Sequence, residues 1–419
     1  MQSLGNRASE QVLSEGLRRY EPVIYRENGN RAVLASQTLR RLEKVASLAG
    51  VTRVAEISQL TRGAFPVFQS SRPSILLNCS AGQNTGAQGK GLTRNQAMIS
   101  CLMETLEGVC MEPRDETLIR GSYGFLRRQH AILPPSIFAR QHGAIKPSLG
   151  EPFVWTTALL LDADSSVLVP AESVYFPFQP CDYATRPVFC SSSNGAAAGS
   201  TYLEATIHAL YELIERHYYA LWESGRLRGE AFLSDELDSV PNMSQFRKAI
   251  DGEFEIELLG LQLPGIKNLP MVVCWLLRQD GAWLYGSGCG PTLDIAIQRA
   301  VSEAVQAWSV VESGTREDLT EGETVSVASS KQFPRVRRLT RSSYLRSAPD
   351  RFFTDLQDEF RFLKNWLRRA GFPSIAIANL TRHGLDIPVV RAIVPGLQAS
   401  RRFGLDSTTA SVNAERFSF

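Results

Sequence analysis

The chain has 419 residues, of which 43% are hydrophobic and 21% are charged, and its 45 Lys and Arg residues nearly balance 43 Asp and Glu. This composition is typical of a soluble globular protein and excludes disordered and fibrous classes. A net charge of +2 gives no global field for nucleic acid or an anionic membrane, so we expect neither as a partner. The N-terminus lacks an apolar signal core, and no apolar run approaches the ~20 residues of a spanning helix. We therefore expect a cytoplasmic protein.

In chain order, residues 36–49 have the apolar spacing of an amphipathic helix within a small N-terminal segment, residues 1–60. Short apolar runs bounded by Gly, Pro or Asp predict strands at 154–161, 255–261, 271–277, 375–377 and 389–394. An Arg-rich polar stretch at 315–350 is typical of a solvated loop, and a helical pattern follows at 352–370. We expect residues 61–400 to form one catalytic domain of the α/β (α+β) class and residues 401–419 to form a C-terminal tail.

The cysteine and histidine patterns argue against a zinc centre. Seven cysteines include no C-x-x-C pair, and five histidines include no H-E-x-x-H. The odd number of cysteines also argues against a disulfide framework.

One pattern occurs three times when the chain is aligned on Gly91, Gly199 and Gly290. A Thr stands two residues after each glycine, a Glu thirteen residues after it, and a polar residue nine residues after it. The position sixteen residues on is Glu or Gln. The aligned residues are Thr93, Thr201 and Thr292; Ser100, His208 and Arg299; Glu104, Glu212 and Glu303; and Glu107, Glu215 and Gln306.

Each copy predicts a helix that begins after a Thr N-cap, and Gln96 and Glu204 are positioned to complete capping boxes in the first two. The polar positions share one stripe of each helix, with apolar residues around it. A Glu pair in a single copy is more simply explained as a solvated face. Three copies with matching caps favour a shared site, in which carboxylates on buried helices need cations.

Magnesium is the predicted cation, because it prefers oxygen ligands and leaves coordination positions for phosphates. Lys90, Arg216 and Arg299 add the positive groups that a triphosphate needs. The glycine-rich stretch at 82–91 is not a Walker A loop, because Asn84 and Gly91 stand at two of its defining positions. A dinucleotide-binding fingerprint is also absent.

These motifs resemble the YcaO superfamily of ATP-dependent enzymes that modify peptide backbones. The resemblance covers about 60–400. Three stretches and the final strand carry it: G-K-G with S-x-x-x-E-x-x-E at 89–107, S-N-G-A-A-A-G with H-x-x-x-E-x-x-E-R at 193–216, R-A-V-S-E-A-V-Q with S-G-T-R-E-D at 299–318, and 389–397.

The resemblance implies an α/β domain whose three helices converge on Mg-ATP. It implies metal ligation by Glu104, Glu107, Glu212, Glu215 and Glu303, and nucleotide contacts from Lys90, Ser100, Asn194, Arg216, Arg299 and Gln306. Glu212, Glu303 and Arg299 would be the catalytic residues. The family's chemistry is attack on a peptide carbonyl followed by phosphorylation of the resulting oxyanion by ATP.

The resemblance leaves three activities open: formation of thiazoline or oxazoline from Cys, Ser or Thr, formation of a thioamide, and nucleotide binding without chemistry. The first is our main expectation, with a precursor peptide as substrate. The family's P-x-P-x-P tail is missing from the C-terminal residues, which favours the second activity. Expected partners are a separate E1-like leader-binding protein or a TfuA-like protein, in a homo- or hetero-oligomer.

Two positions depart from the family pattern. Gly108 replaces an arginine, and His217 stands where aspartate is common. Helical geometry turns His217 away from the carboxylate stripe, so we expect a packed, neutral histidine. We expect Gly108→Arg to be tolerated or to improve ATP binding, with Arg114 or an arginine of the 335–346 stretch filling the gap in the native chain.

Overall fold

The computed structural model describes residues 2–26, 28–61, 65–72, 86–114, 117–141, 144, 146–178, 188–232, 234–238, 240, 242–250, 252–262, 269–279, 283–314 and 350–397. Most of the predicted loop at 315–350 and the whole predicted tail at 401–419 lie outside these residues. In the described part, no helix combines the length and hydrophobicity needed to cross a membrane.

The fold is α+β, and every pairing between named strands in the described residues is antiparallel. The helices are α1 (Gln2–Leu17), α2 (Ala35–Ala46), α3 (Arg94–Met111), α4 (Tyr123–Leu126), α5 (Tyr202–Glu223), α6 (Ser234–Leu237), α7 (Met243–Ile250), α8 (Leu293–Ser313) and α11 (Leu356–Arg369). Short 3₁₀ turns occupy Ser58–Thr61, Pro135–Ile137 and Ala171–Ser173.

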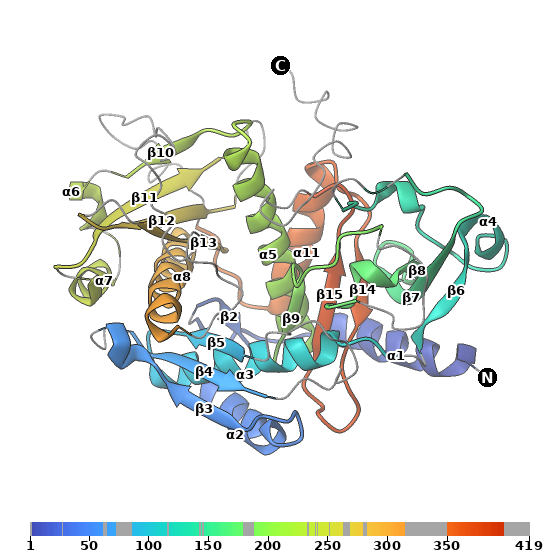
Figure 1. The fold of residues 1–419 in the computed structure, drawn as a ribbon, viewed down its shortest axis with the longest axis horizontal. Helices are drawn as coiled ribbons and strands as arrows, with labels where there is room; N and C mark the ends of the chain where they lie inside the picture. The colour runs from blue at the N-terminus through green and yellow to red at the C-terminus, as the bar shows by residue number, and fades with distance from the viewer. Residues whose placement is uncertain are drawn as a thin grey trace.

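Three sheets frame the site helices (Figure 1). The first is β3 (Arg53–Glu56), β4 (Val67–Ser71) and β5 (Gly86–Lys90). The second, in the order β10-β11-β12-β13, has β10 (Gly229–Ala231), β11 (Glu255–Leu261), β12 (Met271–Leu277) and β13 (Trp283–Cys289). The third, in the order β6-β7-β14-β15-β9 with β8 beside β7, has β6 (Ile119–Ser122), β7 (Pro152–Leu160), β8 (Ser165–Pro170), β9 (Ala196–Ala198), β14 (Ala376–Asn379) and β15 (Val389–Ile393). A two-stranded ribbon joins β1 (Tyr25–Arg26) to β2 (Asn30–Arg31).

Each site helix packs against a sheet. Helix α3 lies on β4 and β5, α8 lies on β12 and β13, and α5 lies between the second and third sheets, where it contacts β13, β9 and β15. The predicted strands at 255–261 and 271–277 match β11 and β12 residue for residue, and the predicted helices at 36–49 and 352–370 are present as α2 and α11. The apolar patterning of these segments is thus confirmed.

The first 60 residues pack closely onto the rest of the described fold. Helix α1 contributes Leu13 and Leu17 to the main core beside α5. Strand β3 pairs with β4, so the predicted division at residue 60 falls within one sheet. The N-terminal residues are therefore positioned to support the site.

Candidate functional site

The three predicted N-caps are present. Thr93, Thr201 and Thr292 each accept a hydrogen bond from a backbone N–H three residues further on. Only the first forms the complete predicted capping box among the described helices. In α5, the Glu204 carboxylate instead accepts from the backbone N–H groups of Ser200 and Ala32, at 3.0 and 2.8 Å, which anchors the N-terminal segment to the helix.

The three aligned glycines owe their position to close packing at the helix starts. A Cβ added at Gly91 would lie 2.4 Å from the Gln96 Cβ, and one at Gly199 would lie 2.5 Å from the Ala205 backbone N. At Gly290 the nearest atom would be 2.7 Å away. The repeat therefore corresponds to one structural motif that occurs three times. In each copy, a strand or turn packs closely against the first turn of a helix.

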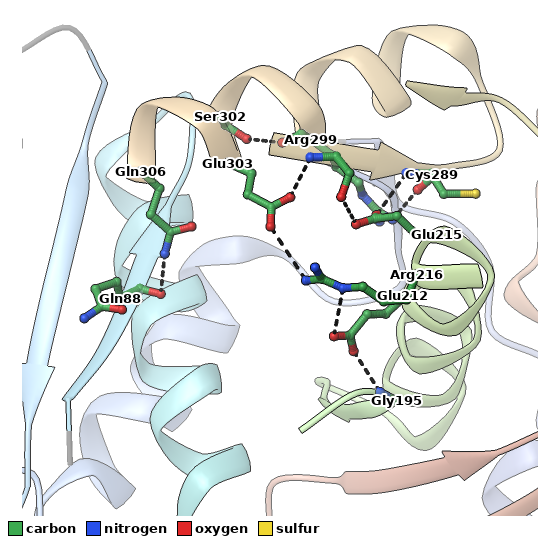
Figure 2. Close-up of polar contacts among 11 residues, drawn as sticks. Gln88, Gly195, Glu212, Glu215, Arg216, Cys289, Arg299, Ser302, Glu303 and Gln306 are labelled. Atoms are coloured by element: carbon green, nitrogen blue, oxygen red, sulfur yellow. Dashed lines mark hydrogen bonds and ion pairs between the residues drawn. The ribbon is translucent and has the colours of Figure 1, made fainter. Parts of the chain in front are cut away.

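The centre of the site is a line of alternating charge. Figure 2 shows the Arg216 guanidinium between two carboxylates on different helices, with its Nε 4.0 Å from Glu212 Oε1 and its Nη2 3.7 Å from Glu303 Oε1. Burial alone would lower the pKa of Arg216, but the carboxylates of Glu303, Glu215 and Glu212 outweigh burial and raise it. Arg216 is held as a permanent cation.

Backbone N–H groups fix one oxygen of each neighbouring carboxylate. Gly195 N–H donates to Glu212 at 3.1 Å, Ser287 N–H to Glu303 at 2.9 Å, and Ala198 N–H to Glu107 at 2.7 Å. The other oxygen of each carboxylate makes no hydrogen bond within the described residues. These three side chains are thus oriented by the backbone, with one oxygen left to bind a cation.

Glu215 differs, because both of its oxygens are engaged. It accepts from Ser287 Oγ at 2.6 Å and from the Cys289 backbone N–H at 3.1 Å. Both donors lie on β13, so Glu215 fastens α5 to that strand. Metal ligation by Glu215 remains a prediction, and the observed role of its side chain is to hold α5 against β13.

The carboxylates are crowded enough to favour a cation. Burial raises the pKa of Glu107 well above its usual value, and the neighbouring Glu104 and Glu212 charges raise it further. Burial also raises the pKa of Glu212 and of Glu215, and the charge of Glu303 adds to both shifts. Divalent cations relieve such repulsion, so the donor set fits Mg²⁺.

The acidic side chains are spread along the site. Among the described residues, no three His, Cys, Asp or Glu side chains are close enough to form a metal cluster by themselves. The Glu104 side chain is exposed, so the expectation that it is embedded among apolar residues is wrong for this member. The open spacing is suited to cations whose remaining ligands are phosphate oxygens and water.

A second group of basic side chains surrounds His208, one turn before Glu212 on α5. The His208 side chain keeps an exposed surface, but surrounding protein still removes hydration and lowers its pKa well below 6.5, and the positive charges of Arg299, Arg31 and Lys90 act in the same direction. No hydrogen bond or ion pair is formed by the side chains of Arg31, Lys90 or His208 within the described structure. The buried carboxylates of Glu215 and Glu359 act on Arg299, but Arg31 and Lys90 form no bonded ion pair in the described residues. Such positive side chains favour an anionic ligand such as phosphate.

Arg299 is fixed by its own neighbours. Its guanidinium donates to the backbone carbonyls of Cys289 at 2.6 Å and Asn28 at 2.9 Å, and it lies over the Tyr211 ring. Tyr211 in turn donates to the buried carboxylate of Glu359 on α11, at 2.9 Å. The arginine is therefore positioned by the N-terminal segment as well as by α5 and β13.

The other predicted nucleotide contacts are dispersed around these two groups. Ser100 on α3 and Asn194 before β9 are half-buried. Gln306 donates from Nε2 to the Gln88 carbonyl at 3.1 Å, which ties α8 to β5 (Figure 2). Their roles toward a nucleotide remain predictions.

The space beside Gly108 is occupied by Arg72. A Cβ added at Gly108 would lie 3.3 Å from Arg72 Nη2. Arg72 pairs with the buried Glu112 at 2.8 Å. From the sequence we expect Arg114 or an arginine of the 335–346 stretch in this space. That stretch lies outside the described residues, and no sequence pattern indicates Arg72. The neighbouring guanidinium now argues against Gly108→Arg being favourable.

His217 is packed inside the protein, as the helical geometry predicts. Its side chain is 6% exposed, its ring meets Phe372 edge-on at 5.2 Å between centroids, and burial lowers its pKa to about 4.

We expect His217→Asn to destabilise the protein by roughly 1–2 kcal/mol at neutral pH while leaving the KM for ATP nearly unchanged. In the parent, burial favours the neutral form of His217. Its contribution to the free energy of unfolding is therefore fully present above pH ~6.5 and is lost as the pH falls toward 4. The variant should lose stability less steeply over that window in chemical unfolding. A large fall in turnover by stably folded His217→Asn protein would contradict the packing role.

Three basic residues near these groups were given no role from the sequence: His208, Arg31 and Arg391. His208 stood in the repeat, aligned with Ser100 and Arg299, and that alignment was a usable signal. Arg31 carried no signal, because it reaches the site from the N-terminal segment. Arg391 on β15 is 5% exposed, and burial lowers its pKa to about 10 although the Glu212 charge opposes the shift.

Comparison with known families identifies this arrangement. A family model described as YcaO cyclodehydratase, ATP- and Mg²⁺-binding, matches residues 88–398. The chain therefore belongs to the YcaO family, and ATP and Mg²⁺ are its cofactors.

Two related sequences and one solved structure are similar to this chain over most of its length. An uncharacterized protein of Methanothermobacter thermautotrophicus is 31% identical over 384 residues, covering 88% of this chain and 94% of its own. An uncharacterized protein of Rhizobium leguminosarum bv. trifolii, from the tfuA 3′ region, is 26% identical, covering 88% and 89%. The structure of YcaO from Methanopyrus kandleri bound with AMPPCP and Mg²⁺ superposes with a TM-score of 0.70 at 24% identity, covering 90% of this chain and 94% of its own. That last likeness establishes the shared fold.

Proposed function

We propose that this member of the YcaO family uses ATP to phosphorylate the oxygen of a backbone amide in a ribosomally made precursor peptide. Cyclodehydration of Cys, Ser or Thr to a thiazoline or oxazoline is the principal activity we propose. The observation that carries the proposal is the Arg216 guanidinium held between Glu212 and Glu303, each of which has one oxygen fixed by a backbone N–H. The family description, an ATP- and Mg²⁺-binding cyclodehydratase, supports it.

Phosphoryl transfer depends on positioning and charge neutralisation more than on a protein nucleophile. The site has the matching parts: carboxylates for Mg²⁺, which neutralises phosphate charge when bound, and the positive side chains of Lys90, Arg31 and Arg299 around a neutral His208 for phosphate oxygens. The Arg216 charge is constant across the working pH range, because its pKa is raised. These features support a role of the site in binding Mg-ATP and in phosphoryl transfer to the peptide amide oxygen.

In the proposed reaction, a peptide thiol or hydroxyl adds to the neighbouring carbonyl carbon and loses its proton, and the electron pair of the C=O bond moves to oxygen. That oxygen attacks the terminal phosphorus of ATP, so an O–P bond forms as the bond to ADP breaks. The amide N–H proton then leaves, a C=N bond forms, and the C–O bond breaks to release phosphate.

Thioamide formation is a second candidate, favoured by the similarity to the Rhizobium protein from the tfuA 3′ region. It shares the phosphorylation step and differs in the nucleophile, which is an external sulfide. A TfuA-like protein would then be the partner, whereas an E1-like protein would present the leader for ring formation.

Mass spectrometry of a precursor peptide co-expressed with the chain distinguishes these candidates. Loss of one water per modified residue supports cyclodehydration, and exchange of one oxygen for sulfur supports thioamidation. An unchanged peptide in the presence of partner and ATP favours a nucleotide-binding scaffold and contradicts both activities.

We expect the purified chain alone to modify its peptide slowly, and a separate partner to accelerate it by roughly a hundredfold. A partner that holds the leader raises the effective concentration of the reacting segment at the site. Turnover should be measured with and without E1-like and TfuA-like candidates. Full activity from the single chain would show that no partner is needed.

A further inference from the structure

Arg391 is a buried guanidinium with unused hydrogen-bonding capacity. Its side chain lies almost entirely out of solvent, at 5% exposure. Its Nε donates to the Ser173 carbonyl at 3.3 Å, while its Nη1 is buried with no partner in the described structure. An arginine offers five N–H donors, and the two on Nη1 are unmet here.

The position of Arg391 is set by the sheet and places it at the site. Strand β15 pairs with β9 so that Arg391 lies opposite Ala196. The preceding residue, Gly195, donates its N–H to Glu212, and Glu212 is the carboxylate whose charge acts on Arg391. The same short segment therefore orients a site carboxylate and adjoins the arginine.

Burying an arginine without a bonded anion costs free energy, and buried charges are normally paired. Arg72 shows the usual arrangement in this protein, since it is also buried but bonds to Glu112 at 2.8 Å. No comparable bonded acid accompanies Arg391 in the described residues. Its unpartnered donor is therefore available to a ligand.

We propose that Arg391 is a further catalytic residue, which binds an anionic oxygen of the transferred phosphoryl group next to Glu212. The inference rests on the proposed function, and it adds a residue from outside the three repeat helices. Guanidinium groups suit this task, because their planar donors match phosphate oxygens and their charge offsets the charge in transfer.

The test compares Arg391→Met and Arg391→Lys with Arg72→Met as the matched control for a structural arginine. Without ligand, Arg391→Met should melt at or above the parental temperature, because it removes an unpaired buried charge. Arg72→Met should melt lower, because it leaves the buried Glu112 without its hydrogen-bonded partner and with only the ion pair to Arg382 at 3.8 Å. Arg391→Lys retains the charge and checks the result if the Met variant folds poorly.

Nucleotide affinities are measured without peptide. They therefore test the role of Arg391 even if the protein does not carry out the proposed peptide modification. Arg391→Met should weaken binding of Mg-AMPPNP by roughly tenfold or more while leaving Mg-ADP nearly unchanged, as expected for a contact to the terminal phosphate. Arg72→Met should keep the parental preference between the two nucleotides.

With peptide, the rate of ATP turnover by Arg391→Met should fall roughly a hundredfold, and added guanidinium should restore part of it in Arg391→Ala. If turnover falls while AMPPNP affinity is unchanged, the anionic oxygen bound is that of the peptide adduct, and the proposed contact to ground-state phosphate is wrong. If Arg391→Met keeps parental nucleotide affinities and parental turnover, Arg391 is not a catalytic residue.

Discussion

Glu212→Gln and Glu303→Gln are each expected to lower ATP-dependent peptide modification by at least about a hundredfold while leaving the fold intact. Each carboxylate faces Arg216 with one oxygen and receives a backbone N–H with the other. An amide at either position keeps the shape but removes the charge that binds a cation and orients the guanidinium.

The apo fold should tolerate the Glu212 change, because burial already raises the pKa of Glu212 and disfavours its ionised form. Circular dichroism and thermal unfolding check this, alongside steady-state turnover. Glu312→Gln is the matched control, since Glu312 is an exposed residue on the same helix as Glu303. Parental turnover by both site variants, measured with partner and peptide, would show that the site has been assigned to the wrong residues.

Gly288→Ala should have the largest effect on stability, a loss of about 3 kcal/mol in the free energy of unfolding. A Cβ at this position would lie 2.2 Å from the Ala296 carbonyl oxygen and 2.7 Å from the Arg299 Cβ. The obstacle is helix backbone, which cannot rotate away, so α8 must move off β13. Because α8 carries Arg299 and Glu303, activity should fall as well.

Urea unfolding measures this loss, since the midpoint shifts while the slope stays constant if only stability changes. Gly150→Ala is the control, because nothing lies within 4 Å of its added Cβ. A Gly288→Ala protein as stable as the parent would mean that β13 and α8 are less closely packed than the structure places them.

The site helices could be predicted because their determinants are local. A Thr cap, a close-packed glycine and an apolar pattern all lie within a few residues of one another, and α3, α5 and α8 begin where those features place them. The conclusion that Glu212 and Glu303 share a site required only that the three copies be equivalent.

The positions of Arg31 and Arg391 beside the site residues could not be predicted in this way. Arg391 comes next to Gly195 through the pairing of β15 with β9, a contact between segments nearly two hundred residues apart. Arg31 reaches Arg299 through a turn in the N-terminal segment, where Gly29 approaches the Arg299 guanidinium. Glu104 shows that the repeat alone does not predict burial. It aligns with Glu212 and Glu303, but its side chain is exposed.

We propose that ATP activates the amide oxygen of a peptide at the site between α3, α5 and α8. The most direct measurement uses a precursor peptide whose backbone carbonyls carry heavy oxygen, incubated with the protein, its partner, Mg²⁺ and ATP. We expect the label to appear in the released inorganic phosphate, one labelled oxygen for each modified residue, whether the product is an azoline or a thioamide. Label that stays in the peptide or passes to water while ATP is consumed would contradict the account.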